Sequence, residues 1–337
     1  MILWIDDFVD DYDFVDDFMK LLLLSYDKNF LYLTGKIFDG SFLICDVSSA
    51  ASKKIIPKIL IVPRMEYERA VKHMKQLAII QYENRKHLRE ILKNHLGKKT
   101  FANFNEMSVS EFKFINKISK LVDFSNKLHK IRATKNHDEI KIIKRACKIT
   151  SWIEKKINEN LVGKSEEEVS KEIEKLAKEK NCSLSFPPIV ASGKNSSFPH
   201  HTPGKRKISS NDVVIIDFGI TYKNYCPDIT RTLLMKNAPK EAKEIYKVVD
   251  SARRKILEKI KSGTRVKDLQ KISNKLLGQK MIHSVIHSIG LEVHEPIPKK
   301  LKENMIICVE PAIYTKNFGI RIENMVLVKK KGCEVLV

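Results

Sequence analysis

The sequence lacks closely spaced cysteine pairs. Its six cysteines, in a chain of 337 residues, stand singly in mostly apolar stretches at 45, 147, 182, 226, 308 and 333. A disulfide framework or a thiolate zinc site needs cysteines in paired or short-spaced motifs, so neither is predicted. Scattered cysteines are typical of a reducing compartment, and we expect a cytoplasmic protein.

Long hydrophobic runs are also missing. The apolar stretch 21–24 is far too short for a membrane span, and no basic segment followed by a long apolar one begins the chain. We therefore expect neither a signal peptide nor a membrane helix. The sequence also has no tandem short repeat and no low-complexity segment.

Negative charge is in deficit, with 62 Lys and Arg against 41 Asp and Glu and a formal net charge of +21. Such a balance suits a nucleic-acid partner, but the lysines are spread along the chain and no arginine-rich stripe alternates with aromatics. We interpret the charge as a lysine-rich surface and expect no nucleic-acid partner. The acidic segment 1–17 is the exception, and its apolar residues from Ile5 to Tyr12 predict an amphipathic helix.

The first part of the chain alternates strand and helix patterns, which predicts a small α/β domain over 1–126. Expected strands are 42–46, 58–62 and 77–80, and expected helices are 65–74, 84–96 and 109–118. A polar linker is predicted over 127–135. Asn136 with Glu139, and Ser165 with Glu168, look like capping boxes of two long helices, the first ending near Gly163. The second domain is predicted over 136–337.

Two aspartates in this second part have the spacing of metal ligands on a hairpin. Asp217 follows the apolar run 213–216, so we place it at or near a strand end, and a turn around 222–224 returns the chain as an antiparallel partner. Asp228 then faces Asp217 across the ladder. Two facing buried carboxylates repel each other, and a metal ion relieves both the repulsion and the cost of burial. The alternative is a hairpin with two exposed aspartates.

Three further side chains complete the candidate ligand set. His287 lies in a histidine-rich segment, and Glu310 and Glu323 each interrupt an apolar run, where an uncompensated charge is costly. Four carboxylates and one imidazole suit Mn²⁺ or Co²⁺, with Zn²⁺ or Fe²⁺ as alternatives. His294 is better placed for substrate than for metal. His283 is a substrate-binding candidate, with a hydrogen-bonded core histidine as the alternative.

With these residues the chain resembles the pita-bread metallopeptidases, the family of methionine aminopeptidase, aminopeptidase P and prolidase. Residues 213–328 carry the resemblance, and the Pro-His-His-Thr-Pro core at 199–203 is closer to the proline-specific members. Segments 30–35 and 63–70 resemble the N-terminal domain of prolidases and creatinase, which methionine aminopeptidases generally lack. The resemblance implies an α+β protein whose curved antiparallel sheet, covered by helices, follows a smaller α/β domain.

The resemblance also assigns roles. Asp217 and Asp228 bind one metal, and Asp228 and Glu323 bridge to a second that His287 and Glu310 complete. Two ions about 3.5–4 Å apart share a water and give a hydroxide that attacks the substrate carbonyl. Glu310 moves the proton to the leaving nitrogen. His200 and His294 bind the carbonyl and its oxyanion, and Arg321 orients a ligand carboxylate, with an ordinary strand ion pair as the alternative.

The predicted function is hydrolysis of the Xaa-Pro bond at the N-terminus of dipeptides or short peptides, by a protein that relatives suggest is a homodimer. One departure puts strict dipeptide preference in question, because the loop 296–305 offers Lys299, Lys300 and Lys302 where many prolidases place an arginine. Two alternatives stay open: an aminopeptidase of broader or methionine specificity, and a non-catalytic module that binds acidic partners. The presence of all five ligand residues argues against the module.

Overall fold

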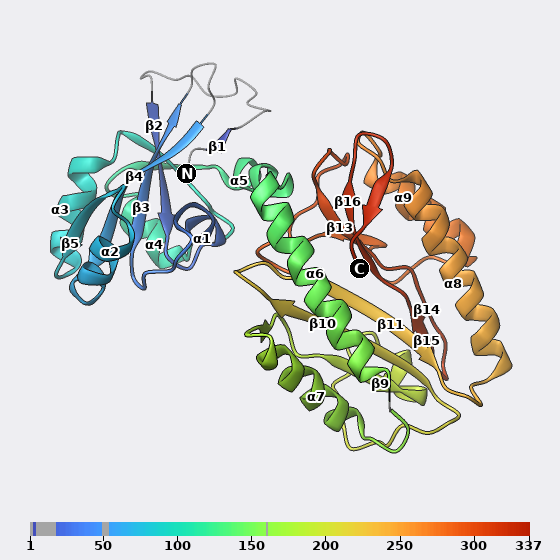
Figure 1. Cartoon of the computed structure of the whole chain (residues 1–337). Helices are drawn as coiled ribbons and strands as arrows, with labels where there is room; N and C mark the ends of the chain where they lie inside the picture. The colour runs from blue at the N-terminus through green and yellow to red at the C-terminus, as the bar shows by residue number, and fades with distance from the viewer. Residues whose placement is uncertain (1–2, 5–17, 49–53, 160) are drawn as a thin grey trace. The chain divides into compact units, whose positions relative to one another are not determined.

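The computed structural model describes residues 3–4, 18–48, 54–159 and 161–337. The predicted acidic helix, whose apolar face begins at Ile5, lies outside the described residues. The chain divides into two compact units, Met1–Ile131 and Arg132–Val337, each with its own sheets and helices (Figure 1). The finer boundaries at 126 and 136 stay a prediction.

The N-terminal unit is built on a mixed seven-stranded sheet, in the order β1-β4-β3-β2-β6-β7 with β5 beside β4. Its strands are β1 (Leu3–Trp4), β2 (Phe18–Leu24), β3 (Phe42–Ser48), β4 (Lys54–Pro63), β5 (Ala78–Tyr82), β6 (Lys99–Ala102) and β7 (Lys120–Asp123). Its helices are α1 (Lys28–Thr34), the short 3-10 turn η1 (Arg64–Glu66), α2 (Tyr67–His73), α3 (Arg85–His95) and α4 (Val109–Ile115). The apolar stretch 21–24 lies inside β2, where all four leucines are buried.

The predicted α/β pattern is confirmed, because helices connect the parallel strand pairs. The three predicted strands and three predicted helices all form. Sequence reasoning missed α1, β2, β6 and β7. Helix α5 (Ser125–Ala133) covers most of the segment predicted as a linker.

Two long helices open the second unit, α6 (His137–Ile157) and α7 (Glu166–Glu179), and both predicted capping boxes are present. Helix α6 ends at Ile157 rather than near Gly163. Gly163 lies in a separate turn, where its φ of 89° is left-handed and its N–H bonds the Ile208 carbonyl.

Antiparallel strands form the sheets of this unit. The first sheet holds β8 (Ser183–Leu184), β9 (Ile189–Ser192), β10 (Val213–Thr221) and β11 (Asp228–Leu234). The second holds β12 (Ile286–Ser288), β13 (Ile306–Val309), β16 (Asn324–Val328) and β17 (Cys333–Val335), and β14 (Ala312–Tyr314) pairs with β15 (Gly319–Arg321). A 3-10 turn, η2 (Gly193–Ser197), follows β9.

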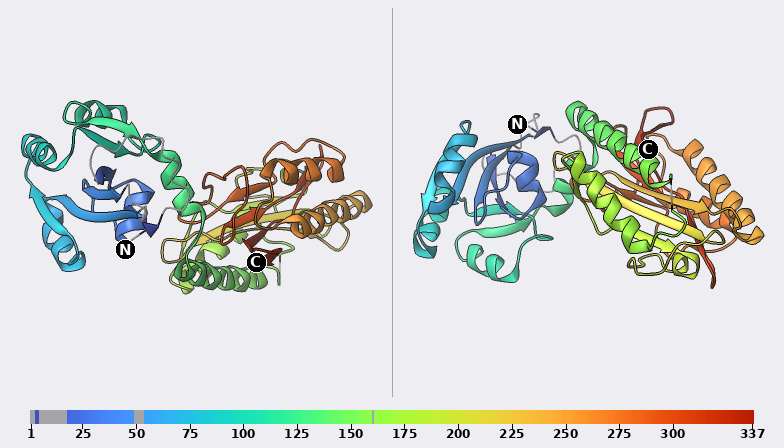
Figure 2. Two further views of the ribbon diagram at one scale, coloured as in Figure 1. Left: turned by 90° about the horizontal axis from the view of Figure 1, so that it is seen from above. Right: turned by 60° about the horizontal axis from the view of Figure 1, so that its bottom comes forward.

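Helices cover these sheets, as predicted. Helices α6 and α7 pack on the strands of the first sheet, and α8 (Lys240–Lys259) and α9 (Val266–Leu277) pack beside the strands of the second (Figures 1 and 2). One continuous apolar core joins α8 and α9 to β12, β13 and β16. Among the described residues, none of the helices combines the length and apolar character that crossing a membrane needs.

Candidate metal centre

Five strands bring the five predicted ligand residues to one cavity of about 630 Å³. Asp217 lies in β10, Asp228 begins β11, His287 lies in β12, Glu310 follows β13 and Glu323 precedes β16. Both four-stranded sheets of the second unit therefore contribute to the lining.

The strand pairing corrects one prediction about the aspartates. Asp217 lies in the middle of the nine-residue strand β10, not at or near its end, and it pairs with Thr230. Asp228 pairs with Gly219, two positions further along. The strand continues because its apolar pattern runs on to a turn in which Lys223 and Asn224 adopt positive φ. Asp228 thus lies diagonally from Asp217 but on the same face of the sheet.

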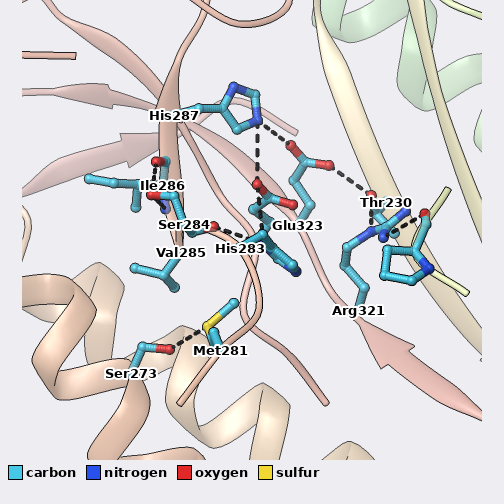
Figure 3. A network of polar contacts seen from close by, with 12 residues as sticks. Thr230, Ser273, Met281, His283, Ser284, Val285, Ile286, His287, Arg321 and Glu323 are labelled. Carbon is cyan, nitrogen blue, oxygen red and sulfur yellow. Dashed lines mark hydrogen bonds and ion pairs between the residues drawn. The ribbon is translucent and has the colours of Figure 1, made fainter. Parts of the chain in front are cut away.

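His287 stands among three of the carboxylates. Its Nε2 atom is 3.5 Å from Glu323 Oε1, 3.9 Å from Asp228 Oδ2 and 3.9 Å from Glu310 Oε1. Figure 3 shows the ring pointing toward Glu323, whose other oxygen accepts a hydrogen bond of 2.8 Å from the Thr230 hydroxyl. Thr230 was not predicted, although its position two residues after Asp228 on one strand face was a usable signal.

Several oxygens in this cluster lack the hydrogen bonds that buried acids normally have. Within the part of the chain that the structure describes, Asp217 Oδ1, Asp228 Oδ1 and Glu323 Oε1 are buried without a hydrogen-bond partner. The contact of 3.5 Å between Glu323 and His287 is an ion pair rather than a good hydrogen bond. Leaving such oxygens unsatisfied is costly, so the arrangement fits cation ligands.

The electrostatics point the same way. Burial raises the pKa of Asp217 to about 6 although Arg321 opposes the rise, and the charge of Glu323 adds to it. Burial, with the charge of Glu323, raises the pKa of Glu310 to about 8. Burial and the neighbouring carboxylates also raise the pKa of Asp228 well above its ordinary value. Ionising all of these acids near neutral pH is therefore costly without added positive charge, which divalent cations supply.

Arg321 ties one ligand to the cavity wall. Its Nη2 atom lies 2.5 Å from Asp217 Oδ2, and its Nη1 donates to the Tyr314 hydroxyl at 2.7 Å and to the Pro199 carbonyl at 3.1 Å. The guanidinium is buried, with 4% of its residue exposed. Tyr314 was not predicted; it ends β14, four residues after Glu310, which lies between β13 and β14.

The three predicted substrate histidines also line the cavity. His200 and His294 are exposed, and the ring of His294 lies edge-on to that of His287 with centroids 4.5 Å apart. His283 Nδ1 lies 3.8 Å from Glu310 Oε1, and its Nε2 lies 3.5 Å from the Tyr314 hydroxyl. His283 is thus a wall residue of the cavity rather than a core histidine.

The loop that carries His200 is held by an acid that sequence reasoning missed. Glu166, the first residue of α7, is fully buried and accepts hydrogen bonds from Ser192, Asn195, His201 and the Gly204 backbone. The contact with His201 Nε2 is 2.8 Å. Acids are common in the first helical turn, so the sequence carries no signal that separates this one from Glu167 and Glu168.

A cysteine beside the ligands was also not predicted as part of the site. Ligand atoms of Asp228, His287, Cys308 and Glu323 all lie within 4.8 Å of one another, and Cys308 pairs with His287 across β12 and β13. The thiol is completely buried, and this burial raises its pKa. A soft sulfur atom therefore borders the hard oxygen ligands.

Comparisons with known proteins agree with this geometry. The model of metallopeptidase family M24 matches residues 141–330, and that of the creatinase/prolidase N-terminal domain matches residues 15–134. The chain belongs to metallopeptidase family M24. The predicted family, the two-domain α+β fold and the enzyme class are confirmed.

Similar proteins of the M24 family cover nearly the whole chain. A Xaa-Pro dipeptidase of Pyrococcus furiosus is 33% identical, over 94% of this chain and 92% of its own. The structure of a Xaa-Pro dipeptidase from Bacillus anthracis superposes with a TM-score of 0.85 at 28% identity, over 95% and 92% of the two chains. That of an X-Pro aminopeptidase from Thermotoga maritima has a TM-score of 0.82 at 27% identity, over 95% of both chains.

Proposed function

We propose that this M24 metallopeptidase hydrolyses the Xaa-Pro bond at the N-terminus of dipeptides or short peptides. The observation that carries the proposal is one cavity lined by five metal-type ligands, by His200, His283 and His294 and by apolar side chains. The names of the relatives, Xaa-Pro dipeptidase and X-Pro aminopeptidase, support the same substrate class.

In this proposal two divalent cations are held by the five ligand residues Asp217, Asp228, His287, Glu310 and Glu323. Mn²⁺ or Co²⁺ is the preferred ion, because most of the ligand atoms are oxygens. When bound, such a pair lowers the pKa of a water molecule and polarises the substrate carbonyl. Arg321 keeps Asp217 oriented as a ligand through its hydrogen bond of 2.5 Å.

The remaining steps belong to side chains of the cavity. Glu310 accepts a proton from the attacking water and delivers it to the leaving nitrogen, a transfer that a carboxylate at the cavity wall performs well. His200 and His294 donate hydrogen bonds to the carbonyl oxygen as negative charge develops on it. His283, beside Glu310, contacts the substrate near the leaving group.

Proline fits the wall of this cavity. Phe186, Ile189, Pro199 and Val293 supply apolar surface next to the ligands. The proline nitrogen carries no hydrogen in the scissile bond, so a wall that offers no acceptor there loses nothing. A residue with an N–H at this position would leave a donor unsatisfied in the same place.

Substrate length is the finer question. The structure places Lys299, Lys300 and Lys302 outside the cavity lining; all three are exposed, and the Lys299 carbonyl accepts from the Val266 N–H at the start of α9. Among the described residues that line the cavity, Arg321 is the only Lys or Arg, and Asp217 already engages it. This absence of a spare cation for a dipeptide carboxylate favours longer Xaa-Pro peptides as well.

A panel of peptides tests the function. Purified protein, freed of metal and reloaded with Mn²⁺ or Co²⁺, is assayed with Met-Pro, Met-Ala and a longer Xaa-Pro peptide. We expect cleavage of both proline peptides and at most slow cleavage of Met-Ala. Faster cleavage of Met-Ala would assign a broader aminopeptidase, and absence of any hydrolysis with bound metal would overturn the proposal.

Homodimerisation and a cytoplasmic location belong to the same proposal. They rest on the architecture that the chain shares with its relatives and on the scattered cysteines. Sedimentation equilibrium of the full chain tests the first, and a monomer at all concentrations would contradict it. Fractionation of the source cells tests the second.

A further inference from the structure

A buried charge cluster stands directly behind the cavity, outside its lining. Glu295, the residue after His294, is 7% exposed and lies between two cations. Arg132 Nη2 contacts its Oε1 atom at 2.5 Å, and Lys135 Nζ contacts its Oε2 atom at 3.1 Å. Lys135 is itself 2% exposed, which is rare for a lysine.

The same carboxylate closes the loop between His287 and His294. Its Oε1 atom accepts from the Leu291 N–H at 3.1 Å, and its own N–H bonds the Ser288 carbonyl at 2.9 Å. A Cβ on Gly290 would lie 2.7 Å from this oxygen, so the backbone passes here only because the residue is glycine. The loop is therefore wrapped around the Glu295 side chain.

The loop determines which nitrogen of His287 carries the proton. His287 Nδ1 lies 3.0 Å from the Val293 carbonyl oxygen. A carbonyl only accepts, so Nδ1 is the protonated nitrogen in the neutral ring. The lone pair then lies on Nε2, the atom that faces Asp228, Glu310 and Glu323.

We propose that Glu295, held by Arg132 and Lys135, is a positioning residue for both histidines. It fixes the loop whose Val293 carbonyl sets the tautomer of His287 and whose next residue, His294, enters the cavity. The assignment of metal and substrate roles to these histidines rests on the proposed function. The tautomer of His287 and the geometry of the loop do not depend on the proposed function.

The charge balance of the cluster explains why it is built from ions. Burial alone would raise the pKa of Glu295, but Lys135 and Arg132 outweigh it and hold the pKa below the ordinary value. Arg132 also pairs at 2.5 Å with Glu292, whose side chain is 32% exposed. Removing one of the three buried partners, Glu295, Arg132 or Lys135, leaves a buried charge uncompensated, whereas water can solvate the partly exposed Glu292.

Two variants that change the charge of this cluster test the role of Glu295. Glu295→Gln removes the negative charge, and the double variant Glu295→Gln with Lys135→Met removes one charge of each sign, which protects the fold. Glu292→Gln is the matched control, since Glu292 lies in the same loop and pairs with the same arginine, but its side chain is partly exposed. Circular dichroism and thermal melting check folding of each protein.

Metal affinity is the first readout. Calorimetric titration of the metal-free proteins with Mn²⁺ should show about 10–100-fold weaker binding in the double variant, the usual effect of losing a partner behind a metal ligand. The control should bind within about twofold of the wild type. The double variant should also have a lower kcat/KM for hydrolysis, because both the metal ligand His287 and the substrate-binding His294 would be less well positioned.

The second readout is the tautomer. Nitrogen chemical shifts of labelled histidines, with His287 assigned by its absence in His287→Asn, report which ring nitrogen is protonated in metal-free and Zn²⁺-loaded protein. We expect Nδ1–H for wild type and a mixture of tautomers in the double variant. A neutral wild-type ring protonated on Nε2 instead of Nδ1 would overturn the inference, as would wild-type shifts and affinity in a folded double variant. Wild-type protein that binds no metal would instead sink the proposed function.

Discussion

Two kinds of buried carboxylate lie within the same unit. Asp228 and Glu323 have oxygens without hydrogen-bond partners among the described residues, whereas Glu166 and Glu295 have every oxygen engaged by N–H, O–H or ammonium donors. Burial and neighbouring charge raise the pKa of Asp228, while burial is outweighed by hydrogen bonds at Glu166, whose pKa is lowered. Asp228 and Glu166 are thus both buried, but their pKa values are shifted in opposite directions.

This difference distinguishes the acids of the metal site from the acids that hold the surrounding loops in place. Acids without partners cost free energy and persist where a ligand satisfies them, and acids with complete partners hold backbone in place. In this protein the first kind lines the cavity. The second kind lies behind the two loops that bring His200 and His294 to it.

The largest effect is expected from Glu310→Gln. The variant keeps the shape of the residue but removes a ligand charge and the proton carrier, so kcat should fall by about 10²–10⁴-fold. Steady-state kinetics with a Xaa-Pro peptide measure it. The exposed Glu303→Gln is the control and should keep wild-type rates. Activity near normal in Glu310→Gln would mean that the proton carrier is misassigned.

Metal binding should stabilise wild type but not a variant with a neutralised ligand. Mn²⁺ at about 100 times its Kd adds about 2.7 kcal/mol to the free energy of unfolding, a shift of about 5–11 °C in Tm for a domain of this size. In Asp228→Asn we expect most of that shift to disappear in calorimetric scans, with a metal-free Tm at or above that of wild type. An undiminished shift would contradict the ligand assignment.

Glu166→Gln tests the other side of the comparison. The amide cannot accept all the hydrogen bonds that the carboxylate accepts, so we expect a loss of about 1–3 kcal/mol in the free energy of unfolding and a lower kcat/KM as His200 moves. Urea unfolding and kinetics measure both. Glu167→Gln is closely matched, because Glu167 lies in the same helical turn but 42% of its side chain is exposed. Equal behaviour of the two variants would show that Glu166 is no anchor.

The last prediction concerns how the stability of the metal-free protein changes with pH. For Asp217, with a pKa of about 6, and Glu310, with a pKa of about 8, the folded pKa exceeds the unfolded one. The folded state therefore binds more protons, and metal-free protein should lose stability as pH rises from about 4 to about 8. Saturating Mn²⁺ should flatten or reverse the slope. Melting curves across pH decide it, and a metal-free slope of the opposite sign would contradict the raised pKa values.

Much of the centre could be predicted because its ligands interrupt apolar strands. Glu310 and Glu323 were recognisable as charges in buried runs, and the capping boxes at Asn136 and Ser165 follow local rules. The strand register was missed because the turn at 222–225 sets it, and the sequence does not show how far β10 extends. Glu166 escaped notice because its partners lie 26 to 38 residues away and form only in the folded chain.

The origin of the ligands in two separate sheets has a mechanical consequence. Asp217 and Asp228 belong to one sheet, while His287, Glu310 and Glu323 belong to the strands and ends of the other. Cations bound by all five would join the two halves of the unit as a cross-link that no covalent bond provides. Chelation should then raise amide hydrogen exchange in β11 and β16 together, far beyond the residues that touch an ion.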